Sequence, residues 1–294
     1  MIYHFRRITS HHFTRPASLR DIFPGSACPA THLPPIRQIT TQAAMASTQS
    51  SALASALFSN SDTTATARTF SEPITTAINS GASSEVLEEK LSSSWHVLID
   101  TAAQTDHRSQ ESLTDIVKAI QQQRASDDEK SKSVTIWGSE AKVWEDMPLL
   151  GASMRSAWNR GMSTLTFTKV TVQVMLTHPA PNSGSKDDFS TSEWTNLNAF
   201  VARLTALSLS LSIPAFDFSL YAIWTLRSAY EKSETDAAAV EAAKIWFVYA
   251  EEAMEKLSHD EKSFEGPIAK AGEKYADREW KGFNEKRLAV WRAG

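Results

Sequence analysis

Apolar side chains recur at helical spacing along most of this chain, and this periodicity constrains its fold more than any other feature. The stripe in one segment consists of Leu87, Leu91, Trp95, Leu98 and Ala102. Because an α-helix turns once in about 3.6 residues, steps of three and four residues place these side chains on one face. Comparable stripes continue toward the end of the chain. We therefore predict an all-α fold, a single domain of about eight helices.

Helix start and stop signals divide the chain into segments. Ser71 is placed to cap a short helix that ends at Gly81, and Asp146 is placed to begin another. Ser190 and Glu193 have the spacing of a capping box, in which each side chain accepts a hydrogen bond from the backbone N–H of the other residue. These signals predict where the helices begin and end.

The segment after Asp236 has the most regular apolar pattern in the sequence. Its apolar positions are Val240, Ala243, Phe247, Ala250, Met254 and Leu257. They alternate by three and four residues, which is typical of the seam of an antiparallel helix pair. We therefore predict a single helix that begins at Asp236 and continues through Leu257, and we expect Asp217 to cap the helix before it.

Charge and cysteine content separate the first 44 residues from the rest. The chain of 294 residues has a formal net charge of −4, but residues 1–44 contain five Arg, no Lys and a single acid, Asp21. This segment therefore carries +4, which leaves −8 on residues 45–294. Cys28 is the sole cysteine, whereas all nine Trp lie after Met45. The composition excludes an intrachain disulfide framework, and the excess of acid argues against nucleic-acid binding.

Residues 1–44 are rich in Arg, Ser and Thr and contain five Pro, so we expect them to be disordered. Three origins fit this segment: a mitochondrial transit peptide, an extension ahead of a true start at Met45, or a plain disordered tail. We expect a cytoplasmic protein, or a mitochondrial one if the transit peptide is real. Residues 45–70 are mostly Ser, Thr and Ala and are predicted to be a linker, which places the helical domain at 71–294. No apolar run approaches the roughly 18 residues that cross a bilayer, so we expect no membrane span.

Residues 161–178 do not fit the helical pattern, because they alternate and are rich in Thr and Val. Such a segment predicts a strand, and a lone strand would leave its backbone groups unpaired. Two explanations stay open, namely a hairpin with part of the lead-in or a translated intron whose splice signals these codons can encode. Together with the Pro/Asn/Gly/Ser loop that follows, residues 161–186 are a suspect insertion or loop.

Few side chains after Met45 stand in catalytic or metal-binding arrangements. The histidines there are His96, His107, His178 and His259, none of which has another at helical metal-ligand spacing. His96 and Asp100 lie one helical turn apart and could orient an imidazole for base catalysis, but such pairs are more often incidental surface neighbours. We therefore expect no metal site, and the sequence names no catalytic residue.

Two acidic pairs invite comparison with the metal-diphosphate sites of helical terpene cyclases. These pairs are Asp127-Asp128 and Asp187-Asp188. A magnesium site of that kind needs further carboxylates one turn on, where this chain has Ser131 and Thr191. The chain also contains no glycine-rich phosphate loop and no nucleophile elbow. We expect no cofactor, and we favour a protein that is not an enzyme.

The last residues of the chain are locally basic. The cluster consists of Arg278, Lys281, Lys286, Arg287 and Arg292, with Trp280 and Trp291 among them. Such a pattern can bind an acidic partner or a phosphate backbone. More often the tryptophans of such a helix pack inward while the charges are solvated, and we favour this interpretation.

Several segments are similar to a known family. They are Val143-Trp-Glu-Asp-Met-Pro-Leu-Leu, Glu193-Trp-Thr-Asn-Leu-Asn-Ala-Phe-Val-Ala-Arg-Leu-Thr, Asp217-Phe-Ser-Leu-Tyr-Ala-Ile-Trp-Thr-Leu-Arg, Ile245-Trp-Phe-Val-Tyr-Ala and Gly282-Phe-Asn-Glu-Lys-Arg-Leu-Ala-Val-Trp. From about Ile136 to the end, the chain resembles the fungal DUF3632 family, which consists of helical proteins of unknown function. Leu288 stands where that family commonly has a Trp, and residues 161–178 also depart from it. The resemblance implies a soluble α-helical fold and a fungal origin, and it implies no catalytic residues.

Two functions stay open at this point. The first is a non-enzymatic scaffold or interaction protein with an unknown protein partner. The second is a small-molecule-binding or enzymatic protein with a pocket between the helices predicted at 193–211, 217–232 and 236–257. The residues that would line this pocket, or alternatively fill the core, are Trp194, Asn198, Trp224, Arg227 and Trp246.

Overall fold

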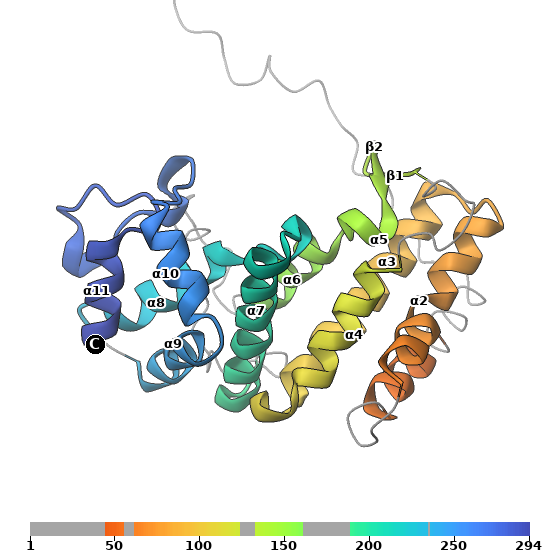
Figure 1. The fold of residues 1–294 in the computed structure, drawn as a ribbon, viewed down its shortest axis with the longest axis horizontal. Coiled ribbons are helices and arrows are strands. Elements are labelled where there is room, and N and C mark those ends of the chain that lie inside the picture. The colour runs from red at the N-terminus through yellow and green to blue at the C-terminus, as the bar shows by residue number, and fades with distance from the viewer. Residues whose placement is uncertain (1–44, 56–61, 124–132, 161–188, 235) are drawn as a thin grey trace, which may run out of the picture. The chain divides into compact units, whose positions relative to one another are not determined.

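The computed structural model describes residues 45–55, 62–123, 133–160, 189–234 and 236–294. This part of the chain is predominantly helical (Figure 1), so the prediction of an all-α fold is confirmed. The predicted disordered segment 1–44, the suspect residues 161–186 and both acidic pairs lie outside the described residues.

The helical part of the chain begins earlier than predicted. Residues 45–55 are helical, and helix α2 spans Thr63–Asn79, so residues 45–70 are not a plain linker. Leu53 and Phe70 are fully buried. The Gln49 side chain, also buried, donates to the Phe70 carbonyl at 2.8 Å and to Ser94 Oγ at 2.8 Å. Composition suggested a linker because few large apolar residues occur here, yet those few are enough when neighbouring helices bury them.

The start of α2 also differs from the prediction. Asp62 is its N-cap and accepts a hydrogen bond from the backbone N–H of Thr64 at 2.9 Å. Ser71 lies inside the helix, donates to the carbonyl of Ala67, and does not cap anything. Gly81 does end the helix, as predicted, with a left-handed φ of 69° that favours glycine.

Helices α3 (Ser84–Gln104) and α4 (Glu111–Gln121) follow, with the short 3-10 helix η2 (His107–Ser109) between them. Both predicted stripes are buried, which confirms these two helices. The buried apolar residues of the two stripes are Leu87, Leu91, Trp95, Leu98, Ala102, Leu113, Ile116, Val117 and Ile120. Helix α2 packs against both α3 and α4.

A small hairpin, which the sequence analysis did not anticipate, precedes the next helices. Strands β1 (Ser133–Ile136) and β2 (Ser139–Lys142) pair antiparallel, and α5 (Val143–Asp146) and α6 (Leu150–Trp158) follow. Asp146 therefore ends one short helix and does not begin the next. The break arises from Met147 and Leu149, whose left-handed φ values of 45° and 67° are incompatible with a continuous right-handed helix.

Helix α7 (Thr191–Leu211) has the predicted capping box. The backbone N–H of Ser190 donates to Glu193 Oε2 at 2.8 Å, and the backbone N–H of Glu193 donates to Ser190 Oγ at 3.3 Å. After the 3-10 helix η4 (Pro214–Phe216), helix α8 spans Ser219–Tyr230. Asp217 lies one residue before the N-cap of α8, where its carboxylate accepts a hydrogen bond from the backbone N–H of Ser219.

The helix predicted from Asp236 through Leu257 is two helices, α9 (Ala237–Tyr249) and α10 (Glu251–His259). Asp236 caps α9 as predicted. The prediction of one continuous helix is wrong because Ala250 leaves the helical region, with a φ of −141°. The chain then passes through the 3-10 helices η5 (Gly266–Ala269) and η6 (Glu273–Tyr275) to the last helix, α11 (Glu285–Ala293).

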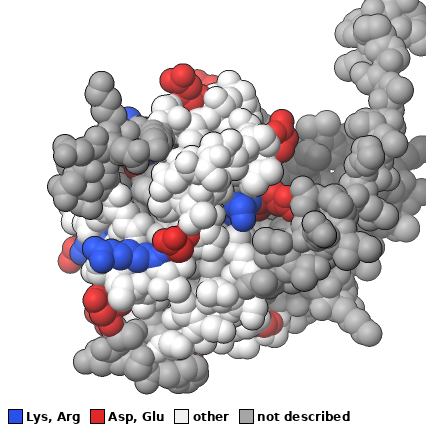
Figure 2. Space-filling model, turned by 90° about the vertical axis from the view of Figure 1, so that its right-hand side faces the viewer, with Lys and Arg blue, Asp and Glu red and all other residues white. Residues whose placement is uncertain are grey.

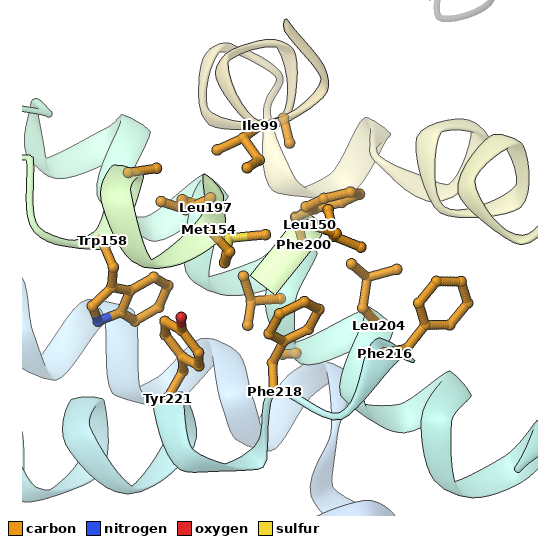
Figure 3. Close-up of a cluster of buried hydrophobic side chains, with 14 of the residues drawn as sticks. Ile99, Leu150, Met154, Trp158, Leu197, Phe200, Leu204, Phe216, Phe218 and Tyr221 are labelled. Carbon is orange, nitrogen blue, oxygen red and sulfur yellow. The ribbon is translucent and has the colours of Figure 1, made fainter. Parts of the chain in front are cut away.

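The buried apolar side chains form one core cluster. Figure 3 shows part of it, where Ile99 of α3 faces side chains of α6, α7 and α8. The other labelled members are Leu150, Met154, Trp158, Leu197, Phe200, Leu204, Phe216, Phe218 and Tyr221. Among the described residues, none of the helices is long and apolar enough to cross a membrane.

The capping box gives the first testable prediction. Ser190→Ala should lower the free energy of unfolding by about 1 kcal/mol, because it removes the acceptor for an N–H at the start of α7. Chemical denaturation followed by circular dichroism would measure this change. Ser210→Ala, in the exposed last turn of the same helix, serves as the control and should change stability by less. Equal effects of the two substitutions would contradict the assigned role of Ser190.

Candidate functional site

Asn198 on α7 lies at the centre of the residues that the sequence analysis singled out. Its Oδ1 accepts hydrogen bonds from Trp246 Nε1 at 2.9 Å and from Thr225 Oγ1 at 2.8 Å. Its Nδ2 donates to the carbonyl of Trp194 at 2.9 Å. Asn198 and Trp246 are fully buried. The structure therefore brings three of the five predicted residues together, as a hydrogen-bonded part of the core that joins α7, α8 and α9.

A chain of aromatic contacts connects Trp194 to Trp224, the fourth predicted residue. The ring centroids of Trp158 lie 4.6 Å from those of Trp194 and 4.7 Å from those of Tyr221, and Tyr221 lies 5.0 Å from Trp224. The guanidinium of Arg155 stands 4.2 Å from the Trp224 ring centroid. Burial raises the pKa of Tyr221 to about 12, so its hydroxyl is neutral at physiological pH. Trp158 and Tyr221, which link the predicted residues, were not themselves among them.

Arg227, the fifth predicted residue, contacts the backbone around η5. Its Nη1 donates to the carbonyls of Ile268 at 3.3 Å and Lys270 at 3.1 Å, and Trp224 Nε1 donates to the same Ile268 carbonyl at 3.0 Å. Burial lowers the pKa of Arg227 to about 10, and the nearby positive charge of Arg287 acts in the same direction. Trp224 and Arg227 thus hold the segment around η5 against α8.

A fully buried ion pair lies beside this contact. Arg287 of α11 donates from Nε to Glu231 Oε1 at 2.8 Å and from Nη2 to Oε2 at 3.1 Å, and both side chains are 0% exposed. Trp291 Nε1 donates to Glu231 Oε1 at 2.7 Å, and the backbone N–H of Gly272 donates to Oε2. Arg287 also donates from Nη1 to the carbonyl of Ala269 at 2.7 Å. Both charges therefore have the dense hydrogen bonding that a buried ion pair requires.

These contacts decide the interpretation of the basic cluster near the end of the chain. Arg287 and Trp291 are buried, and Arg292 forms ion pairs with Glu251 and Glu255 of α10. Two of the five basic residues are thus committed to intramolecular carboxylates that lie far away in sequence. Trp291 packs inward, as the favoured interpretation predicts, but the expectation that the charges are solvated is wrong for Arg287, which is buried against Glu231.

The histidines of the described chain make local or structural contacts. His96 Nδ1 lies 2.7 Å from the carbonyl of Ser92, whereas Asp100 accepts a hydrogen bond from Arg160 at 2.7 Å, so the suggested His96–Asp100 pair is divided between other partners. His107 Nδ1 lies 2.8 Å from the hydroxyl of Tyr249. Within the described ranges, no group of three or more His, Cys, Asp or Glu side chains is placed to hold a metal ion.

The tip of the β1–β2 hairpin presents the most exposed large apolar side chain of the described residues. Trp137 is 69% exposed, compared with 63% for Val248 and 41% for Leu211. Trp137 and Gly138 form the two-residue turn with φ values of 50° and 76°, as in a type I′ turn. Asn or Gly is the usual first residue of such a turn, because a bulky residue with positive φ is strained.

Two contacts hold this strained turn in place. The backbone N–H of Trp137 donates to Glu88 Oε1 at 2.7 Å, which attaches the tip to the first turns of α3. Ile136, which precedes it, is buried in the core. The backbone is therefore anchored on both sides while the indole projects into solvent. The Trp-Gly dipeptide between Ile136 and Ser139 was the sequence signal for this turn, although Asn-Gly would have been a stronger one.

Comparison with known proteins gives a family but no characterised relative. A model of the family described as "Protein of unknown function (DUF3632)" matches residues 95–294. No curated protein and no solved structure matches the chain. The family resemblance inferred from the sequence is therefore confirmed, whereas the fungal origin stays a prediction.

The buried ion pair gives a second prediction. Arg287→Met or Glu231→Gln should each lower the free energy of unfolding by about 3–5 kcal/mol, because each leaves a desolvated group without its partner. Arg292→Met removes the two exposed pairs with Glu251 and Glu255 and should cost less than about 1 kcal/mol. Urea denaturation of the three variants measures both effects. A small loss at Arg287, similar to that at Arg292, would show that the pair does not hold α11 in place.

Proposed function

The chain belongs to the DUF3632 family, whose function is unknown. From the geometry of its described residues, we propose that it is an interaction protein that binds a partner protein through Trp137. The exposure and the strained backbone of Trp137 are together the observation that carries this proposal. No other residue of the described chain combines a large exposed apolar side chain with a left-handed backbone.

Physical reasons favour a binding role for this side chain. Trp is strongly enriched among the residues that dominate protein–protein binding energy, because one side chain buries a large area with little rotamer entropy. A positive φ at a bulky residue costs roughly 1 kcal/mol or more, and such strain is found most often at functional positions. An Asn in this turn would avoid the strain, so the Trp contributes something other than stability.

The charges around the tip indicate what kind of partner fits. Glu88 bonds the Trp137 backbone, Glu85 lies one turn earlier on the same helix, and Glu140 lies in β2 next to the turn. Three carboxylates thus lie on the elements that adjoin the tip, and that of Glu88 bonds its backbone. We therefore infer a partner protein that has an apolar pocket with basic groups at its rim, because unlike charges at an interface steer association.

The first helices of the described chain, on the same side of the molecule as the hairpin in Figure 1, are poor in charge. The residues of the helix at 45–55 carry no charge, and α2 contains only Arg68 and Glu72. Figure 2, which views the molecule from this side, shows that most of the described surface there is uncharged. Depletion of charge is typical of the centres of protein interfaces.

The alternative proposal, a ligand pocket lined by tryptophans, has less support. Asn198, Trp194 and Trp246 are at most 2% exposed. The amide of Asn198 uses its hydrogen bonds on groups of the protein itself, which are Trp246 Nε1, Thr225 Oγ1 and the Trp194 carbonyl. The hydrogen bonds of the Asn198 amide are thus made within the protein, as is usual for a buried polar group.

A photo-crosslinking residue in place of Trp137 tests the proposal. In cells that express this variant, irradiation should produce a discrete adduct with a single protein, which mass spectrometry identifies. The control carries the same crosslinker in place of Val248, which is about as exposed but lies on α9, away from the hairpin. The adduct should be absent from the control. Equal labelling at both positions, or an adduct of two copies of this chain, would overturn the proposal.

Trp137→Asn separates binding from stability. Because Asn adopts positive φ more readily, the free energy of unfolding should stay the same or rise by about 1 kcal/mol. Binding of the purified variant to the crosslinked partner, measured by calorimetry, should weaken by about 2 kcal/mol or more, as expected for a central Trp. A stable Trp137→Asn variant with unchanged affinity would show that the indole is not the contact.

We keep the cytoplasm as the proposed compartment, with the mitochondrion as the alternative if residues 1–44 act as a transit peptide. Mass spectrometry of the N-terminus of the native protein distinguishes these origins. A peptide that reads through Ala44-Met45 excludes a start at Met45, and cleavage within residues 1–44 supports import.

A further inference from the structure

Backbone strain is concentrated in the segment that comprises the hairpin, α5 and the turn into α6. Among the described residues, five that are not glycine have a left-handed φ, and three of them lie in this segment. They are Trp137 at 50°, Met147 at 45° and Leu149 at 67°. Such a conformation costs free energy at a bulky residue and persists only where surrounding contacts impose it. Residues 133–149, which we call the strap, are therefore strained at the hairpin tip and at the turn.

Helix α3 holds the strap at both strained places. Glu88 Oε1 accepts a hydrogen bond from the backbone N–H of Trp137 at 2.7 Å. Trp95 Nε1 donates at 2.8 Å to the carbonyl of Pro148, which lies between the two left-handed residues of the turn. Glu88 and Trp95 are two helical turns apart, which places both side chains on the same face of α3. One helix face thus fixes the tip and the turn.

The strap buries few large side chains for its length. Those that are at most 5% exposed are Ile136, Val143 and Met147, and three of the four residues of β2 are exposed. Segments with few buried apolar contacts open at a lower free energy than the core of a protein. Release of the strap would also relieve the strain of its three left-handed residues. Strain and sparse burial therefore both favour local opening of this segment.

We propose that the strap opens as one unit before the core unfolds, and that the two hydrogen bonds from α3 determine how often it opens. The closed strap fixes the backbone of Trp137, whereas the open strap releases it. Opening would therefore lower the apparent affinity of a partner that requires the fixed indole. This consequence rests on the proposed function of Trp137, but the opening itself does not.

Amide hydrogen exchange of the full chain, followed by NMR, tests the proposal without a partner. The reporter is the amide of Met147, which donates to the carbonyl of Val143 and lies in the turn rather than at the tip. In the unmodified protein this amide should exchange faster than that of Phe200 in the core. Its protection should equal that of the paired amides of β1 and β2, because one opening exposes them all.

Substitutions at the tip should change exchange at the turn. Glu88→Ala should speed exchange of the Met147 amide about tenfold, as expected for the loss of a hydrogen bond to a charged group. Glu89→Ala, the matched control, removes a carboxylate from the next position of α3 and should leave the rate unchanged. Trp137→Asn relieves the positive φ at an exposed position and should slow exchange of the Met147 amide about fivefold.

Three results would overturn the proposal. The first is a Met147 amide that exchanges as slowly as that of Phe200 in the unmodified protein. The second is an equal effect of Glu88→Ala and Glu89→Ala. The third is an unchanged rate in Trp137→Asn, which decides the question alone if Glu88→Ala does not fold. Coupled exchange without a crosslinked partner at Trp137 would instead overturn the proposed function and leave the strap.

Discussion

The buried ion pair between Glu231 and Arg287 is the interaction on which the C-terminal third of this protein depends. Two charges without solvent are stable only when every oxygen and N–H has a partner. Here Trp291 Nε1 and the backbone N–H of Gly272 donate hydrogen bonds to the Glu231 carboxylate. Backbone carbonyls of the η5 region accept hydrogen bonds from the Arg287 guanidinium. Helix α8, the irregular segment around η5 and helix α11 must therefore fold together, because the separation of any one of them would leave a charged group without its hydrogen-bond partners.

Hydrogen bonds of a buried polar side chain also connect the helices in the middle of the core. Asn198 joins α7, α8 and α9 through hydrogen bonds to Trp194, Thr225 and Trp246. A stack of aromatic rings then continues through Trp158 to Trp224. These side chains therefore use their polar groups and ring faces on contacts within the protein, which join α6, α7, α8 and α9.

Predictions from the sequence succeeded where the deciding interactions are local. The capping box of Ser190 and Glu193 and the stop at Gly81 depend on residues within one turn. Predictions failed where backbone conformation is set by distant packing. Asp146 does not begin a helix because Met147 and Leu149 adopt left-handed φ, and the apolar seam past Ala250 bends although its spacing stays regular. Residues 45–55 are helical because α2 and α3 bury Leu53 and bond Gln49.

The sequence by itself determined the helical class, the family and those helix boundaries that local motifs mark, since periodicity and short motifs carry that information. It also singled out the residues that surround Asn198, although it could not tell a pocket from a core. Only the tertiary structure showed that Trp194, Asn198 and Trp246 are buried and hydrogen-bonded to one another, and only the structure paired Glu231 with Arg287, 56 positions apart. Two residues so far apart in sequence produce no periodic pattern, because their contact depends on how every helix between them packs.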